Sequence, residues 1–353
     1  MALNETLVLG GFLVLIVLML MIDIGVFHKK DHVVGYKEAL TWTSVWVFLA
    51  LATGVFIYFF GDLIHDVNSL ADVRDKAIEY GHPILKQLDG ITDEEALHIY
   101  RRNLSLEYLT GYVIEYSLSI DNIFVIVLIF FSFNVDKKYY HRVLFWGILG
   151  AIVMRFLFIF LASSLIHEFE WVLLIFGGFL VFTGAKMFLD RNKEKKIDKE
   201  KHPVLRFTSR FFRVDSKYVG HNFFIKKDGK IYLTTLFIVL LVVEFSDVIF
   251  AVDSVPAIFS ITKDPYIVFF SNIFAIIGLR SLFFLLINVL DKFRFLHIGL
   301  SILLIFVGVK MILPFLDFLG NPHISTLNSL VIVVSIIGGS ILASLLIPKK
   351  KEK

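Results

Sequence analysis

VVEFSDVIFAVDSVPAI, residues 242–258, is the stretch that decides the fold of this chain. It has the apolar character of a membrane-spanning helix, yet it contains the carboxylates Glu244, Asp247 and Asp253. A charged carboxylate at the centre of a bilayer costs roughly 2.5–3.5 kcal/mol on insertion scales. Carboxylates in this setting indicate a functional site inside the membrane.

A second stretch, VIEYSLSIDNIFVIV at 113–127, has the same character and contains Glu115 and Asp121. The composition of the chain agrees with a membrane setting. Of its 353 residues, 57% are hydrophobic and 19% are charged, whereas about 25% are charged in soluble domains. The sequence contains no cysteine, which excludes disulfides, thiolate metal sites and cysteine nucleophiles.

Apolar runs long enough to cross about 30 Å of hydrocarbon occur nine times. They lie near 6–26, 40–60, 108–131, 143–164, 171–189, 231–256, 266–288, 295–316 and 326–347. The first run has no basic residue before it and no small-residue cleavage site after it, so we expect it to remain as a helix. The sequence therefore predicts an all-α polytopic membrane protein with about nine transmembrane helices.

Lysine and arginine are concentrated in alternate loops, and the segment 190–230 alone holds thirteen of them. Such residues favour the cytoplasmic side of a membrane. We therefore expect the protein to lie in the inner (plasma) membrane of the cell, with its N-terminus outside and its Lys349–Lys351 tail in the cytoplasm. The long segment 61–107 then lies outside, and it is acidic. We interpret His65, His82 and His98 within it as surface residues, because their spacing fits no compact metal motif.

Two groups of three predicted helices resemble each other in sequence. Acidic, polar and basic residues recur in the same order and at nearly the same spacing. The matched pairs are Glu115 with Asp247, Asp121 with Asp253, Asn122 with Ser254, Arg155 with Arg280, and Lys186 with Lys310. An odd number of helices in each unit makes the second unit enter the membrane from the opposite side. Transporters built from such inverted repeats bind their substrates near the membrane midplane, between the repeats.

The repeat divides the chain into six parts. They are two peripheral helices (1–60), an acidic extracytoplasmic loop (61–107), the first three-helix repeat (108–189), a basic cytoplasmic loop (190–230), the second three-helix repeat (231–316), and the last helix with its basic tail (317–353).

The polar groups in the predicted spans are mostly oxygen donors, and they form our candidate metal site. Its members are Glu115, Asp121, Asn122, Glu244, Asp247 and Asp253, with Asp23 and Ser254 as additional candidates. Oxygen ligands suit Mg²⁺, Ca²⁺ or Mn²⁺ better than Zn²⁺ or Cu²⁺. Clustered, desolvated acids also retain protons, so exchange of protons for the metal is a natural coupling.

Four basic residues accompany these acids: Arg155, Arg280, Lys186 and Lys310. One interpretation gives them a charge-balancing or gating role, with an arginine replacing the cation in the empty state. The other makes the acids and arginines structural ion pairs, and places the lysines at helix ends, where their long side chains reach the interface. Both interpretations remain open at this point.

Pro256 indicates that the helix formed by residues 242–258 is irregular. Positions six apart on an ideal helix point about 240° apart, so Asp247 and Asp253 do not share a face. Proline removes a backbone hydrogen bond. We therefore expect the helix to be kinked or unwound between Asp247 and Pro256, which would bring its acids together.

Catalytic signatures are missing from the sequence. It has no HExxH, GxGD, Gly-x-Ser-x-Gly or P-loop motif, which would indicate a protease, hydrolase or nucleotide-binding enzyme. We expect no enzyme activity, no nucleic-acid partner and no cofactor beyond the transported metal. Protein partners are expected, if anywhere, at 190–230.

EYSLSIDN at 115–122 and EFSDVIFAVDSVPAIF at 244–259 resemble signature segments of the TerC family. The resemblance extends from IDIGVFHKK at 22–30 to GVKM at 308–311. It implies three-helix inverted repeats, and efflux of Mn²⁺ for manganese homeostasis or for metal supply to exported enzymes. It also implies that the family's acidic positions fall on the candidate metal ligands above. The family name refers to tellurium resistance, which we interpret as an indirect phenotype because an oxyanion does not suit a site lined with acids.

Two alternatives accompany the exporter hypothesis. The first is a non-transporting membrane factor that assists protein insertion or joins a tellurite-resistance complex. The second stays within transport and replaces Mn²⁺ with Ca²⁺ or another cation.

Overall fold

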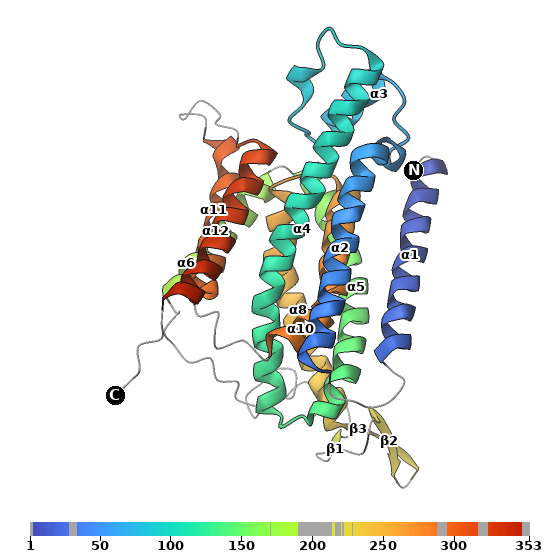
Figure 1. The fold of residues 1–353 in the computed structure, drawn as a ribbon, viewed down its shortest axis with the longest axis vertical. Coiled ribbons are helices and arrows are strands. Elements are labelled where there is room, and N and C mark those ends of the chain that lie inside the picture. The colour runs from blue at the N-terminus through green and yellow to red at the C-terminus, as the bar shows by residue number, and fades with distance from the viewer. Residues whose placement is uncertain are drawn as a thin grey trace.

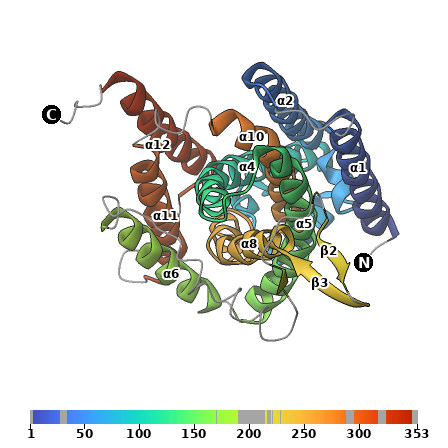
Figure 2. The same ribbon diagram turned by 90° about the horizontal axis from the view of Figure 1, so that it is seen from below.

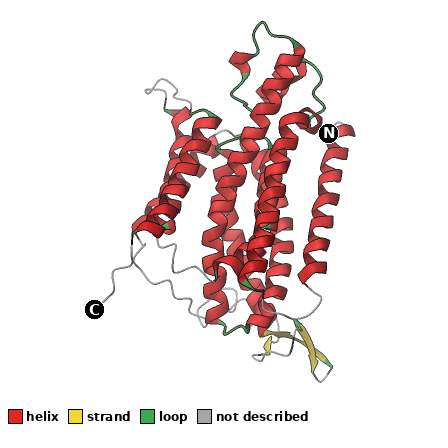
Figure 3. Cartoon of the chain, viewed as in Figure 1, coloured by secondary structure: helices red, strands yellow, loops and turns green. Residues whose placement is uncertain are grey.

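The computed structural model describes residues 3–27, 34–169, 171–189, 214–215, 220, 222–227, 229–287, 295–316 and 324–347. The long helices are α1 (Leu3–Phe27), α2 (Tyr36–Phe60), α4 (Asp93–Ser132), α5 (Lys137–Glu168), α6 (Trp171–Leu189), α8 (Thr235–Phe259), α11 (Leu296–Ile312) and α12 (Thr326–Leu346). The shorter ones are α3 (Leu70–Glu79), α9 (Pro265–Ile277) and α10 (Leu279–Leu286), with 3₁₀ turns at Gly61–Ile64, Leu85–Gln87 and Leu313–Phe315. Figure 3 shows how helices dominate the molecule.

The membrane-protein prediction is confirmed. Among the described residues, seven helices are long and apolar enough to cross a membrane, and α9 with α10 makes an eighth if this pair is counted as one span. The pair is bent by 41°, at Gly278. The first predicted span corresponds to α1, within which Val8–Met21 forms a shorter apolar helix. The chain is thus a polytopic all-α membrane protein.

The expected irregularity lies in a different helix. α8 is a continuous α-helix that contains Pro256, so the predicted unwinding between Asp247 and Pro256 is wrong. Pro256 comes in the last turn of α8, where few backbone bonds follow it. Neighbouring helices can also satisfy the backbone groups that a proline frees inside a membrane protein. The broken span is the next one, where the chain bends between α9 and α10.

α4 is the central helix of the bundle. It packs against α2, α8, α9 and α12, and seen along the bundle it lies beside α5 and α8 in the middle of the molecule (Figure 2). The helices α6, α11 and α12 form one flank, and α1 and α2 form the other (Figure 1). The middle of the bundle is therefore enclosed by helices from both predicted repeats.

The 61–107 segment forms a small projection at one end of the bundle (Figure 1). Its last part is the beginning of the 40-residue α4, whose N-terminus carries a capping box made by Thr92 and Glu95. The interpretation of His65 and His82 as surface residues is wrong, because only 3% and 2% of their surfaces are exposed. His98 does lie at the surface.

A three-stranded sheet lies at the opposite end of the bundle (Figure 1). Its order is β1 (Val214–Asp215), β3 (Lys230–Thr234) and β2 (Phe224–Lys227). β2 and β3 pair antiparallel, and a turn at Gly229 joins them. Gly229 has φ +75°, which glycine adopts without steric cost.

α6 and α11 make the most extensive helix contact in the described chain. Glycines allow their backbones to approach: a Cβ placed on Gly177 would lie 2.9 Å from the carbonyl oxygen of Gly308. A Cβ on Gly184 would lie 2.8 Å from the carbonyl oxygen of Ser301. Small residues at such interfaces are the usual basis of close helix packing in membranes.

We predict that Gly177→Ala destabilises the protein by about 1–3 kcal/mol, the usual cost of overpacking a close contact. Gly178 is the matched control, because it is the adjacent residue of α6 and nothing lies within 4 Å of a Cβ there. Gly178→Ala should leave stability unchanged or raise it slightly. The measurement is the thermal midpoint of both purified variants in detergent. Equal midpoints would contradict the proposed contact between α6 and α11.

Candidate functional site

A buried arginine lies at the centre of the site. Arg155, near the middle of α5, has no exposed surface, and Nη1 of its guanidinium donates to the carboxylate of Glu115. The same nitrogen lies 3.0 Å from Oδ1 of Asn272 and 3.3 Å from Oγ of Ser254. Nη2 donates to Oδ1 of Asp247 at 3.3 Å. We call these five residues the Arg155 cluster.

Four helices supply this cluster: Glu115 lies on α4, Arg155 on α5, Asp247 and Ser254 on α8, and Asn272 on α9. A further hydrogen bond closes the network, because Nδ2 of Asn272 donates to Oε2 of Glu115 at 3.1 Å. Asp247 is at the midpoint of α8. The cluster therefore joins helices of both predicted repeats deep in the bundle, and it brings the matched carboxylates Glu115 and Asp247 to one guanidinium.

The charges of the cluster do not balance if both acids are ionised. Two carboxylates then face one guanidinium, and the second oxygen of Asp247 is buried without a hydrogen-bond partner among the described residues. The side chain of Asp247 retains 15% exposure, whereas those of Arg155 and Glu115 have none. A buried charge is costly unless it is paired. Asp247 is consequently the member of the cluster whose charge is least compensated.

Glu244 lies one turn before Asp247 on α8, so the two carboxylates share a face of the helix. The Glu244 carboxylate packs directly onto Gly150 of α5, where any Cβ would overlap it. Glycine at this position makes the space that the carboxylate occupies. Glu244 is thus held close to the Arg155 cluster, on the same side of α8.

Two small cavities adjoin these residues. One, of about 20 Å³, is lined by Asn122, Ser246 and Asp247 together with apolar side chains. The other, of about 50 Å³, is lined by Asn122, Thr183 and Ser254 among others. A water molecule needs roughly 10–15 Å³ of such space. Asn122 borders both cavities, so polar groups and room for a small hydrated species occur together here.

The structure does not describe the side chains of all the predicted metal ligands. The side chains of Asp23, Asp121 and Asp253 lie outside the described part of the structure. Among the side chains that are described, no three acidic or histidine groups converge in a metal site. Instead, a guanidinium lies between Glu115 and Asp247.

The other basic candidates lie on three helices. Arg280 is fully buried on α10. Lys310 is partly buried on α11, and Lys186 is exposed on α6. The matched lysines therefore differ in exposure, whereas the matched arginines are both fully buried.

Sequence reasoning missed Asn272 and Gly150. Asn272 is a fully buried amide in the apolar run 266–288, and polar residues inside predicted spans are functional candidates. The same criterion that selected Asn122 would therefore have found it. No pattern in the sequence distinguishes Gly150 from other glycines, because its role depends on which side chain packs against it.

We predict that Arg155→Met destabilises the protein by about 3–5 kcal/mol, because it leaves buried carboxylates without their cation. Adding Glu115→Gln and Asp247→Asn to this variant should recover part of the loss. Arg74→Met is the control, since Arg74 pairs with Asp89 at the surface, with side chains 45% and 79% exposed, where a pair contributes about 0–1 kcal/mol. Thermal midpoints in detergent measure the stability of all three variants. A small effect of Arg155→Met would contradict the ion group around Arg155.

The chain was compared with known proteins. The integral membrane protein TerC family matches residues 101–352. An uncharacterised membrane protein of Myxococcus xanthus is 42% identical over 338 residues, which cover 96% of this chain and 91% of that protein. Proteins named Alx and described as candidate membrane-bound redox modulators are also similar. The Salmonella typhi protein is 38% identical over 98% of this chain and 95% of its own length, and that of Escherichia coli K12 is 40% identical over 89% and 87%.

No solved structure shows a significant match to this chain. The family match covers well over half of the chain, and relatives of nearly the same length align with it almost from end to end. The chain therefore belongs to the TerC family of integral membrane proteins.

Proposed function

We propose that this protein exports divalent metal cations, Mn²⁺ foremost, through a site between two inverted repeats. The observation that carries the proposal is the pairing of Glu115 and Asp247 with one buried arginine. These two acids occupy matched positions of the repeats. One Asp247 oxygen is left unpaired beside a small cavity. A site of this kind is expected near the midplane of an inverted-repeat transporter.

The contact between α6 and α11 supports the repeat. Gly184 of the first unit approaches Ser301 and Ile305, and Gly308 of the second unit approaches Gly177 and Val181. With Gly184 matched to Gly308, the same offset matches Gly177 to Ser301 and Val181 to Ile305. Each contact is therefore the counterpart of the other, as an approximate two-fold axis in the membrane plane requires. The two helices also run antiparallel at this contact, since higher numbers on one meet lower numbers on the other.

Arg155 acts in this proposal as the counter-ion of the empty site. Its guanidinium neutralises one carboxylate charge while no metal is bound, and an arriving dication displaces it from Asp247. Asp247, Glu244, Asn122 and Ser254 then offer the oxygen atoms that Mn²⁺, Mg²⁺ and Ca²⁺ prefer. We name Mn²⁺ as the main substrate because the family resemblance implies it. Oxygen ligands accept the other hard cations as well.

Proton exchange and orientation complete the proposal. Release of the metal leaves clustered acids that bind protons readily, so inward movement of protons can drive outward movement of metal. The basic segment near the β-sheet favours a cytoplasmic position for that end of the bundle. The 61–107 segment then faces the outside. Because the chain contains no cysteine, dithiol–disulfide exchange is not a chemistry it can perform, and we place any redox effect downstream of cation transport.

We predict that Asp247→Asn lowers the initial rate of Mn²⁺ uptake into inside-out vesicles at least about tenfold. The reason is that the amide removes the unpaired negative charge that attracts the cation. Asp136→Asn is the control, because Asp136 is an exposed acid outside the helices that pairs with Lys138 at the surface. Uptake should be compared for Mn²⁺, Ca²⁺, Mg²⁺ and Zn²⁺ at equal protein content.

Full Mn²⁺ uptake by Asp247→Asn would overturn the proposed site. If that variant also kept its function in cells, while changes in the β2–β3 hairpin abolished it, a non-transporting membrane factor would be the better description.

A further inference from the structure

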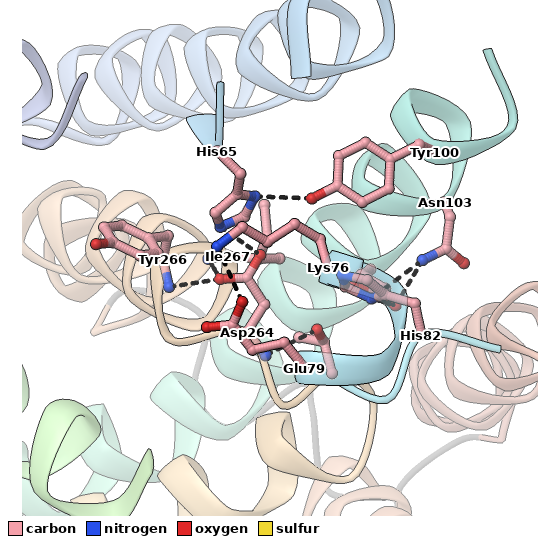
Figure 4. Close-up of polar contacts among 11 residues, drawn as sticks. His65, Lys76, Glu79, His82, Tyr100, Asn103, Asp264, Tyr266 and Ile267 are labelled. Atoms are coloured by element: carbon pink, nitrogen blue, oxygen red, sulfur yellow. Dashed lines mark hydrogen bonds and ion pairs between the residues drawn. The ribbon is translucent and has the colours of Figure 1, made fainter. Parts of the chain in front are cut away.

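The 61–107 segment is attached to the bundle by buried polar contacts rather than by apolar packing alone (Figure 4). His65 and His82 both come from this segment, and both are almost completely buried. Polar side chains are expensive to bury in this way unless they are paired. Nδ1 of each ring has a hydrogen-bond partner on α4, and Nε2 of His65 faces Asp264.

His65 connects the segment to α9 and α4. Its Nε2 lies 3.4 Å from Oδ2 of Asp264, and neither side chain has any exposed surface. On the other side of the ring, Nδ1 lies 2.8 Å from the hydroxyl of Tyr100 on α4. Asp264 is also the N-cap of α9, where its Oδ1 accepts from the backbone N–H groups of Tyr266 and Ile267. The imidazole is thus held between the start of α9 and the side of α4.

His82 makes a second connection to α4. Its Nδ1 donates to Oε1 of Glu107 at 2.9 Å, in a pair whose side chains are 0% and 1% exposed. Nδ2 of Asn103 donates to the same Glu107 oxygen at 2.7 Å. Figure 4 shows His65 and His82 from the same segment, with Asp264 below the first ring and Asn103 beside the second.

The helices joined in this way belong to different repeats. α4 is the first helix of the first unit and supplies Glu115 to the Arg155 cluster, whereas α9 begins the middle span of the second unit and supplies Asn272. Alternating access requires the repeats to move against each other around the site. A connection between them at one end of the bundle opposes that movement.

We propose that the two histidine–carboxylate pairs, His65 with Asp264 and His82 with Glu107, form a lock that holds the outer ends of the two repeats together. The lock closes the outer side in the conformation described here, and it opens when the cation is released outward. The role of the lock in transport rests on the proposed function. The connection between the repeats rests only on the contacts described above.

A large cleft lies against the lock. Its volume is about 1020 Å³, and its lining includes His65, Glu79, Lys263 and Tyr266. The cleft separates part of the 61–107 segment from the end of α5 and from the loop before α9. Opening of the His65–Asp264 pair would extend this space toward the buried beginning of α9, which makes the pair the barrier between the cleft and the bundle interior.

Charge supports the lock at neutral and mildly acidic pH. Burial opposes the charged form of His82. The Glu107 carboxylate, together with Asp264, favours the charged form more strongly and raises the pKa of His82 above its ordinary value. Burial favours a neutral Asp264, but His65, with a contribution from His82, outweighs it and lowers the pKa of Asp264. The groups facing the two rings are Asp264, Glu107, Asn103, Tyr80, Tyr100 and Tyr266.

The sign of the pH effect follows from these directions. The contribution of His82 is complete below its unfolded pKa of about 6.5 and is lost as pH rises through the folded value. The contribution of Asp264 is complete above its unfolded pKa of about 3.9 and is lost only at lower pH, as its folded pKa is passed. The lock should therefore open as the external pH becomes alkaline.

The absence of native cysteines allows a direct test by thiol labelling. Ile267, in the first turn of α9, has no exposed surface, and Ile267→Cys places a single thiol behind the lock. A membrane-impermeant thiol reagent is added to intact cells carrying this full-length variant, alone or combined with His65→Gln and His82→Gln. We expect the double glutamine change to raise the labelling rate at least about fivefold. Because thiol reagents react with the thiolate, raising the external pH from about 6 to 9 speeds labelling in every variant. The increase should be larger when both histidines are present than in the double glutamine variant.

Two controls isolate the lock. His98→Gln changes a histidine of the same segment that lies at the surface and contacts Tyr58, and it should leave labelling of Ile267→Cys unchanged. Val73→Cys, at a fully buried position of α3 on the same outer side, should stay unlabelled in the same background if the segment remains folded. If Val73→Cys becomes reactive, single His65→Gln and His82→Gln variants replace the double variant.

Unchanged labelling of Ile267→Cys in folded lock variants would overturn the lock. Labelling and transport are separate readouts, so the two proposals can fail separately. A lock that opens as expected in a protein that moves no divalent cation would refute the transport proposal alone. Normal Mn²⁺ transport with labelling unaffected by the histidines would refute the lock alone.

Discussion

The guanidinium of Arg155 between Glu115 and Asp247 is the interaction on which the rest of the structure depends. An ion group of this kind is stable in a low-dielectric interior only when each charge is compensated at close range. Four helices must therefore be held in fixed register around it, and α4, α5, α8 and α9 pack together as the core of the bundle. The same requirement makes the cluster responsive, because a cation that reaches Asp247 changes the charge balance for all its members.

Much of this arrangement could be predicted from the sequence. The apolar runs located the spans, and the acids within them located the cluster, because charges inside a membrane are rare unless they have a function. The matching of Glu115 with Asp247 also indicated which helices should meet. These predictions depend on the properties of single residues and on their order along the chain.

Other features depend on three-dimensional packing, and the sequence did not reveal them. Arg155 and Arg280 occupy matched positions, but only the contacts around Arg155 could show that it joins both acids. Pro256 suggested an irregular α8, yet the bend lies after α9. His65 and His82 looked like surface residues because their partners, Asp264 and Glu107, are 199 and 25 positions away in the chain. Loop residues acquire such roles when a distant segment covers them.

The unbroken course of α4 has a mechanical consequence. The helix runs without interruption from the capping box at Thr92, past Tyr100, to Glu115 and beyond. At 1.5 Å per residue, Tyr100 and Glu115 are about 22 Å apart along a stiff rod. A tilt of about 5° around Tyr100 would shift Glu115 by about 2 Å, enough to take a hydrogen bond out of range. A small displacement of the 61–107 segment can therefore move the buried charges of the Arg155 cluster.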